Sequence, residues 1–225
     1  MATPLPQILS NLHAAAEAAG RPDPRLLAVS KTQPAEAVAA LAAQGQHAFG
    51  ENYVQEALAK MQVLQHLELE WHLIGHLQSN KAEAVASHFD WVQSVDRPKL
   101  VTALARHRPA ARGPLNVLVQ VNIDDESSKH GCAPEAVDAL ATAIAAEPQL
   151  RLRGLMAIPA PWPEAERRRD AFVRMRTLFQ SLAAQHAHVD TLSMGMSSDY
   201  AEAIAEGATL VRIGTALFGA RPRPA

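Results

Sequence analysis

The sequence predicts an α/β fold, a single (β/α)8 barrel with an extra N-terminal helix. Two observations lead to this expectation. Short apolar runs of strand length alternate with helical stretches along the chain of 225 residues, and eight such runs can be distinguished. The runs are continuously apolar, which is typical of parallel strands that are covered on both faces by helices.

The expected elements follow in chain order. An alanine-rich helix over residues 8–19, ended by Gly20, precedes the first strand. The strands are expected at residues 26–30, 47–50, 71–75, 91–95, 117–123, 152–158, 191–194 and 210–213. A helical segment should follow each strand except the last, and the clearest cover residues 55–64, 80–87, 98–106, 134–146, 164–185 and 200–206. Asp96 is positioned to cap the helix at 98–106, and Pro134 suits the first turn of the next helix.

A closed TIM-type barrel is favoured over an open doubly wound sheet. Eight strand–helix units in 225 residues are compact for a barrel, which typically needs about 250 residues. The open sheet usually has a glycine-rich dinucleotide-binding turn after its first strand, whereas this chain has Lys31-Thr32-Gln33-Pro34 there. Because no linker or repeat divides the chain, residues 1–225 are expected to form one domain.

Composition and charge exclude several function classes. The formal net charge is −2, so nucleic acid is not an expected partner, and the basic run at residues 167–169 is interpreted as a solvated helix face. A single cysteine, Cys132, excludes an internal disulfide and fits a reducing compartment. We see no secretory signal and no apolar run near the roughly 20 residues that span a bilayer. These features predict a soluble cytoplasmic protein, and we expect it to be a monomer.

Lys31 is the residue with the clearest chemical significance. It follows an apolar strand directly, so it is expected to be desolvated on one side. Desolvation lowers the pKa of a lysine amine, and the neutral amine is the form that condenses with an aldehyde. Lys31 is therefore a candidate for Schiff-base chemistry.

The turns after the seventh and eighth strands are expected to hold a phosphate, as the corresponding loops of (β/α)8 barrels commonly do. Ser197 or Asp199 can cap the following helix, with Glu202 completing a capping box. Gly195 lets the backbone come close to an anion, and Gly214 opens a second short turn. A lysine combined with a phosphate site suggests pyridoxal 5′-phosphate (PLP), held as a Schiff base on Lys31.

Arg212 lies two residues before Gly214, so both point to the same side of the strand. It is expected to reach a ligand in the barrel mouth, with a structural salt bridge as the alternative. An arginine facing the pyridine nitrogen would leave that nitrogen unprotonated and weaken the cofactor as an electron sink. No metal site is expected, because His72 and His76 lack a nearby third ligand.

Five motifs in order resemble the pyridoxal phosphate homeostasis proteins, small PLP-binding barrels of PLP fold type III related to the N-terminal domain of alanine racemase. They are LAVSKT at 27–32, FGENYVQE at 49–56, WHLIGHLQSNK at 71–81, SMGMSSD at 193–199 and VRIGTALFG at 211–219. The resemblance implies that Lys31 carries PLP. It places the following residues around the phosphate: Ser193, Gly195, Ser197, Gly214 and Thr215. It places Asn52, Met156 and Arg212 around the ring, with His76 near. Some family members have a lysine where this chain has Gln33.

Three functions remain open. The resemblance implies an intracellular PLP carrier or buffer without catalysis, with apo forms of PLP-dependent enzymes as recipients. The alternative is an amino-acid racemase-like enzyme, but alanine racemase adds a β-rich domain and a tyrosine from the partner subunit. This chain ends shortly after its eighth strand, and Lys31 is its one expected base, so racemisation should be poor. A third possibility is a barrel for another phosphorylated metabolite, with Lys31 as an ion-pair partner.

Overall fold

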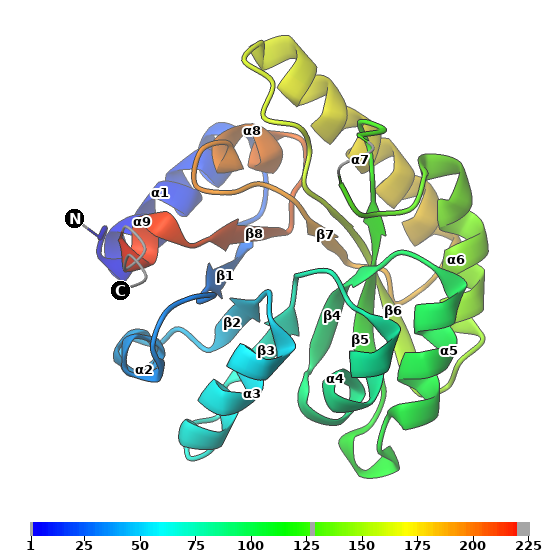
Figure 1. Cartoon of the computed structure of the whole chain (residues 1–225). Helices are drawn as coiled ribbons and strands as arrows, with labels where there is room; N and C mark the ends of the chain where they lie inside the picture. The colour runs from blue at the N-terminus through cyan, green and yellow to red at the C-terminus, as the bar shows by residue number, and fades with distance from the viewer. Residues whose placement is uncertain (1, 127–128, 220–225) are drawn as a thin grey trace.

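A computed structural model describes residues 2–126 and 129–219 of the chain (Figure 1). The strands form a closed barrel in sequence order, and every pairing is parallel, including the pairing of β1 with β8 that closes the barrel. The strands are β1 (Arg25–Val29), β2 (Ala48–Glu51), β3 (Glu70–Leu73), β4 (Trp91–Val95), β5 (Leu115–Val121), β6 (Leu150–Ala157), β7 (Thr191–Ser193) and β8 (Leu210–Ile213). The predicted (β/α)8 barrel is confirmed, and the open sheet is not formed.

Each predicted strand is present; β4 and β8 have the predicted bounds, and the other strands have ends displaced by one or two residues. Strand β6 begins at Leu150 and includes the exposed Arg151, which the apolar pattern left out. The ladder hydrogen bonds are made by the backbone, so a charged residue can extend a strand whenever its side chain reaches solvent.

Helices surround the barrel (Figure 1). They are α1 (Leu5–Ala18), α2 (Ala35–Ala42), α3 (Val54–Val63), α4 (Ala82–His88), α5 (Pro98–His107), α6 (Val137–Ala145), α7 (Ala165–Gln185), α8 (Tyr200–Ala205) and α9 (Thr215–Phe218). Short 3-10 helices cover Ser79–Lys81, Ala110–Arg112 and Pro134–Ala136. Helix α1 is the expected extra helix and packs against α8 and α9. It begins earlier than predicted because a proline is tolerated in the first turn.

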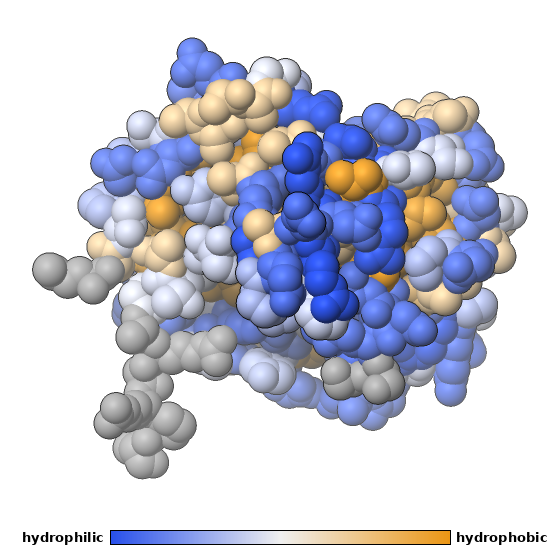
Figure 2. Space-filling view, turned by 90° about the horizontal axis from the view of Figure 1, so that it is seen from above, coloured by the Kyte–Doolittle hydropathy of each residue, from blue (hydrophilic) through white to orange (hydrophobic). Residues whose placement is uncertain are grey.

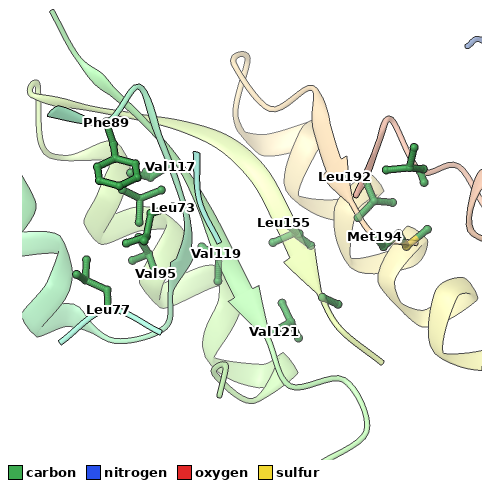
Figure 3. Packing of buried hydrophobic residues seen from close by; sticks show 14 of the residues in the cluster. Leu73, Leu77, Phe89, Val95, Val117, Val119, Val121, Leu155, Leu192 and Met194 are labelled. Carbon is green, nitrogen blue, oxygen red and sulfur yellow. The ribbon is translucent and has the colours of Figure 1, made fainter. Parts of the chain in front are cut away.

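Alternate residues of the strands form two separate apolar layers. Val117, Val119 and Val121 of β5 point to the same side, toward the helices, and belong to the main hydrophobic cluster (Figure 3). Their neighbour Leu118 points the other way and packs with Met156 inside the barrel. Because both faces of each strand are buried, the strands read as continuous apolar runs.

The cap predicted for α5 is wrong. The carboxylate of Asp96 pairs with Arg97 at 2.6 Å, and Arg97 itself is the N-cap residue of that helix, without a side-chain cap. The ion pair satisfies Asp96 more strongly than a neutral backbone N–H would, since hydrogen bonds between two charged groups are the stronger ones.

The outer surface shown in Figure 2 is mostly hydrophilic, with small separate apolar patches. Within residues 2–126 and 129–219, the exposed large hydrophobic side chains are Leu9, Tyr53, Val63 and Ile158. None of the helices described is long and apolar enough to cross a membrane.

Candidate active site

A pocket of about 260 Å³ opens at the carboxyl ends of the strands. Its lining comes from the ends of β1, β2, β3, β6, β7 and β8, which is where (β/α)8 barrels place their sites. The lining residues are Val29, Lys31, Asn52, Ile74, Ile158, Met196, Ser197, Ser198, Arg212, Gly214 and Thr215. Two of them are cationic and none is acidic, so the pocket is suited to an anionic ligand.

Lys31 reaches this pocket because of the alternation along β1. Leu27 and Val29 pack inside the barrel, whereas Leu26 and Ala28 belong to the outer apolar layer. Lys31 lies two residues beyond Val29 and lines the mouth of the barrel. The next residue, Thr32, has a φ of 62°, in the left-handed region that a β-branched residue rarely adopts. Such a strained turn persists only when its surroundings hold it.

A buried lysine, Lys60 of α3, supports the turn that carries Lys31. Its ammonium group donates to the Ser30 carbonyl, to Glu51 Oε1 and to Glu56 Oε1, each at 2.7 Å. Glu56 Oε1 also accepts the Thr32 N–H at 2.5 Å, and Ser30 Oγ donates to Glu51. Burial raises the pKa of Glu51, while the hydrogen bonds from Lys60 and Ser30 oppose that rise. The network therefore connects the strained turn to β2 and α3.

Arg212 belongs to β8, the strand that pairs with β1 and closes the barrel. Its Nη1 donates to Ser193 Oγ at 2.7 Å and its Nη2 to the Ala157 carbonyl at 2.8 Å. Burial lowers the pKa of Arg212 to about 10, so the guanidinium remains charged at neutral pH. The predicted inward orientation agrees with this position, and the alternative of a salt bridge is not found among the described residues.

A chain of buried polar side chains crosses the barrel interior and ends on Arg212. Ser193 Oγ donates to Gln93 Oε1 at 2.7 Å, and Gln93 Nε2 lies 2.9 Å from His72 Nδ1. His72 Nε2 lies 2.7 Å from Glu70 Oε1. The Gln93 amide can donate only to an unprotonated Nδ1, so His72 is the neutral tautomer with its proton on Nε2. Burial lowers the pKa of His72, which agrees with a neutral ring. These hydrogen-bonded side chains therefore fix the orientation of the Arg212 guanidinium from inside the barrel.

Donor groups gather at the other end of the pocket, in the turns after β7 and β8. Among the described residues, the N–H groups of Ser197, Ser198 and Thr215 have no protein acceptor, and each residue also carries a hydroxyl. A Cβ at position 214 would lie 3.2 Å from the Val29 carbonyl, so Gly214 lets this turn approach β1 closely. Several donors without a carboxylate between them can bind a phosphate.

The predicted capping box after β7 is wrong. The carboxylate of Asp199 accepts the N–H of Met196 at 2.6 Å, which closes the turn before the helix. Glu202 pairs with Arg168 of α7 at 2.9 Å, so it does not reach back to Asp199. The basic run at 167–169 is therefore not simply solvated, because part of it fastens α7 to α8.

Six of the ten predicted site residues line the pocket, and four lie elsewhere. Ser193 and Met156 are fully buried beneath it. Gly195 has a φ of +91°, and a Cβ there would lie 2.6 Å from Ala203, so it permits the approach of α8. His76 lines a neighbouring cavity of about 300 Å³, which shares Asn52 with the pocket.

Sequence reasoning missed the supporting residues. Lys60 lies on the face of α3 that also buries Val54 and Ala57. A lysine at the three-residue spacing of the buried helix face was the sequence pattern that could have indicated its burial. Gln93 had a similar signal, as a polar residue within an apolar strand. The apolar lining residues Ile74 and Ile158 had no such signal, because isoleucine is common in any strand.

A wider groove of about 560 Å³ lies between the loops after β5 and β6 and helix α7. Its charged groups neutralise one another: Arg174 pairs with Asp124 at 2.8 Å and with Asp170 at 2.9 Å. Arg167 stacks on Trp162 with its guanidinium carbon 3.5 Å from the ring centroid. We therefore assign the functional site to the smaller pocket, whose lining contains two cationic side chains and no acidic one.

Comparison with known proteins agrees with this assignment. The family described as "Alanine racemase, N-terminal domain" matches residues 4–222. The pyridoxal phosphate homeostasis protein of Pseudomonas aeruginosa is 55% identical over 218 residues, covering 96% of this chain and 93% of the relative. The protein of the same name from Escherichia coli K12 is 52% identical over 222 residues, covering 96% and 95%. The chain belongs to the pyridoxal phosphate homeostasis protein family.

Solved structures place this family member in the same fold. PipY of Synechococcus elongatus with PLP bound has a TM-score of 0.80 and 38% identity, covering 94% of this chain and all of that chain. Alanine racemase of Corynebacterium glutamicum has a TM-score of 0.69 and 21% identity, covering 98% of this chain and 63% of that chain. At that identity the racemase shows the shared fold alone.

Proposed function

We propose that this protein binds PLP at the barrel mouth through a Schiff base with Lys31 and acts in PLP homeostasis as a carrier without catalysis. The observation that carries the proposal is the arrangement of the pocket. Lys31 and the buried Arg212 both line it, and phosphate donors occupy its end at the β7 and β8 turns. The relatives named for PLP homeostasis, and PipY with PLP bound, support the same assignment.

The donors and acceptors of the pocket fit PLP. Ser197, Ser198 and Thr215 provide neutral donors for the phosphate. Within the described chain, Asn52 Oδ1 is the one buried side-chain atom of the lining without a hydrogen-bond partner, and it suits a hydroxyl group such as that of the pyridine ring. A volume of about 260 Å³ is near the lower end of the range for small-ligand sites, as expected for a compact cofactor.

When bound, PLP supplies an aldehyde that condenses with a lysine amine with loss of water, and its ring can act as an electron sink. Lys31 is the amine of the pocket lining. Arg212 remains protonated, so it would hold the ring nitrogen as a hydrogen-bond donor without protonating it. This arrangement keeps the electron sink weak, which favours storage of the cofactor over reaction.

The lining also argues against racemisation. Inversion at a carbon needs an acid and a base on opposite faces of the substrate. Lys31 is the only group among the described lining residues suited to act as a base, since Arg212 holds its proton too firmly. Tyr53 lines the neighbouring cavity with its side chain largely exposed. The proposal includes apo-enzymes of the cytoplasm as recipients and a monomeric protein.

Borohydride reduction followed by peptide mass spectrometry tests the proposal. Reduction should fix a pyridoxyl group on the peptide that contains Lys31, and Lys31→Ala should lose both the adduct and the visible absorption band of the imine. Lys99→Ala, at an exposed lysine of α5, is the matched control and should behave as the wild type. An adduct mainly on Lys81 or Lys129 would contradict the assignment of Lys31.

Two further measurements separate the alternatives. A carrier should transfer PLP to an apo-enzyme faster than PLP dissociates into solution, measured with a free-PLP trap present. Sustained turnover of L-alanine at about 1 s⁻¹ or above would instead indicate an enzyme. Binding of phosphate esters without any imine band would favour another phosphorylated metabolite.

A further inference from the structure

Three side chains with metal-ligating atoms meet on the rim of the barrel, beside the pocket. Among the residues that the structure describes, His76, Asp96 and His130 each bring one ligand atom to within 4.8 Å of the other two. His76 follows β3, Asp96 follows β4, and His130 lies in the loop after β5. Sequence spacing predicted no third ligand for His76, because the other two residues are distant in the chain and only barrel closure brings them together.

The two imidazole rings are stacked on one another. The ring centroids of His76 and His130 are 3.7 Å apart with an interplanar angle of 16°. Neutral imidazole is the form that ligates a metal.

Neighbouring groups hold the Asp96 side chain and the backbone beside His76 and His130. The Asp96 carboxylate accepts from Arg97 Nη1 at 2.6 Å, while Arg97 Nη2 donates to the Leu77 carbonyl at 2.8 Å. The His130 carbonyl accepts from Gln120 Nε2 at 3.1 Å, and a parallel bridge between Val121 and Cys132 fastens the same loop to β5. Supporting hydrogen bonds of this kind commonly orient the ligands of metal sites.

We propose that His76, Asp96 and His130 bind a divalent transition-metal ion of the Zn²⁺ type. Two imidazoles and one carboxylate match the ligands that Zn²⁺ accepts, with bonds of about 2.0–2.2 Å. His76 and His130 are exposed, so rotation of the rings can bring their nitrogens onto one ion. Three protein ligands leave a coordination position for water. The ion would join the loop after β5 to the ends of β3 and β4.

The site adjoins the cofactor pocket but does not depend on it. His76 lines the neighbouring cavity of about 300 Å³, which meets the pocket at Asn52. Neither Asp96 nor His130 lines the pocket. The inference therefore does not rest on PLP binding, and its test can be made on the protein with or without PLP.

Calorimetric titration of the full chain with Zn²⁺ tests the proposal. The wild type should bind one ion with a dissociation constant on the order of 1 µM or tighter. His130→Ala and Asp96→Asn should each weaken binding by at least about tenfold, since loss of a supporting group alone costs that much. His188→Ala removes an exposed histidine far from the site and should bind Zn²⁺ as the wild type does.

The protein loaded with PLP should be titrated in parallel, because PLP can itself chelate metals. Zn²⁺ held by PLP would be insensitive to His130→Ala, and that result would overturn the proposal. No saturable binding by the wild type up to about 100 µM would also overturn it. Substitution with Co²⁺ gives a second readout, since its visible spectrum should change between the wild type and Asp96→Asn. His130→Gln serves as a second variant if His130→Ala does not fold.

Discussion

Replacing Lys60 with methionine tests whether the buried network under Lys31 stabilises the barrel. Lys60 makes three hydrogen bonds, to the Ser30 carbonyl, Glu51 and Glu56. In Lys60→Met the methionine fills most of the volume, but the fully buried Glu51 loses its cation. Removing one partner of a buried ion pair costs about 3–5 kcal/mol, a large part of the roughly 5–15 kcal/mol that keeps a domain folded.

The assay is urea unfolding at neutral pH, followed by circular dichroism and tryptophan fluorescence. Lys60→Met should lower the free energy of unfolding by about 3–5 kcal/mol, whereas Lys99→Met, at an exposed site, should stay within about 0.5 kcal/mol of the wild type. The double variant Lys60→Met with Glu51→Gln removes both charges and should recover much of the loss. A loss below about 1 kcal/mol in Lys60→Met would refute the reasoning, because it would mean that Glu51 is uncharged or that its bond from Ser30 suffices without the cation.

Three other predictions concern the pocket and the acid stability of the barrel. Ser197→Ala should weaken PLP by about 10- to 100-fold, through loss of a hydrogen bond to a charged group, while binding of phosphate-free pyridoxal changes little; equal losses would make the serine a purely structural residue. Gln93→Leu breaks the chain that orients Arg212 and should weaken PLP binding and shift the visible absorption of the bound cofactor; an unchanged spectrum with unchanged affinity would show that Arg212 is held without it. Glu70 is subject to burial, which raises its pKa, but His72 and Arg25 outweigh burial and bring the pKa from 4.5 to about 2. Since its folded pKa is depressed, Glu70 contributes stability above about pH 4.5 that is lost as the pH falls toward 2. In Glu70→Gln the free energy of unfolding should therefore depend less on pH between about 4.5 and 2. An unchanged pH dependence would contradict the lowered pKa.

The order of elements was predictable from the sequence because it depends on local patterns. Continuous apolar runs and the helical segments between them are set by neighbouring residues, and parallel strands covered on both faces account for both. The same reasoning located Lys31 and the turns containing Ser197 and Gly214, since strand ends converge on one rim of a barrel. The inward direction of Arg212 followed from its spacing to Gly214.

The partners of these residues were decided only by the closed barrel. Gln93 and Ser193 are 100 residues apart in the chain, yet their side chains are hydrogen-bonded inside it. Periodicity indicates which face of a strand is buried, but it does not identify the side chain that will lie across the interior. The same limit applied to His76, Asp96 and His130, which three separate strands bring to the rim. The sequence by itself thus determined the order of strands and helices and the position of Lys31 at a strand end. Closure of the barrel decided which side chains lie near Lys31 and Arg212, because hydrogen bonds and ligand sets depend on distances between residues far apart in the chain.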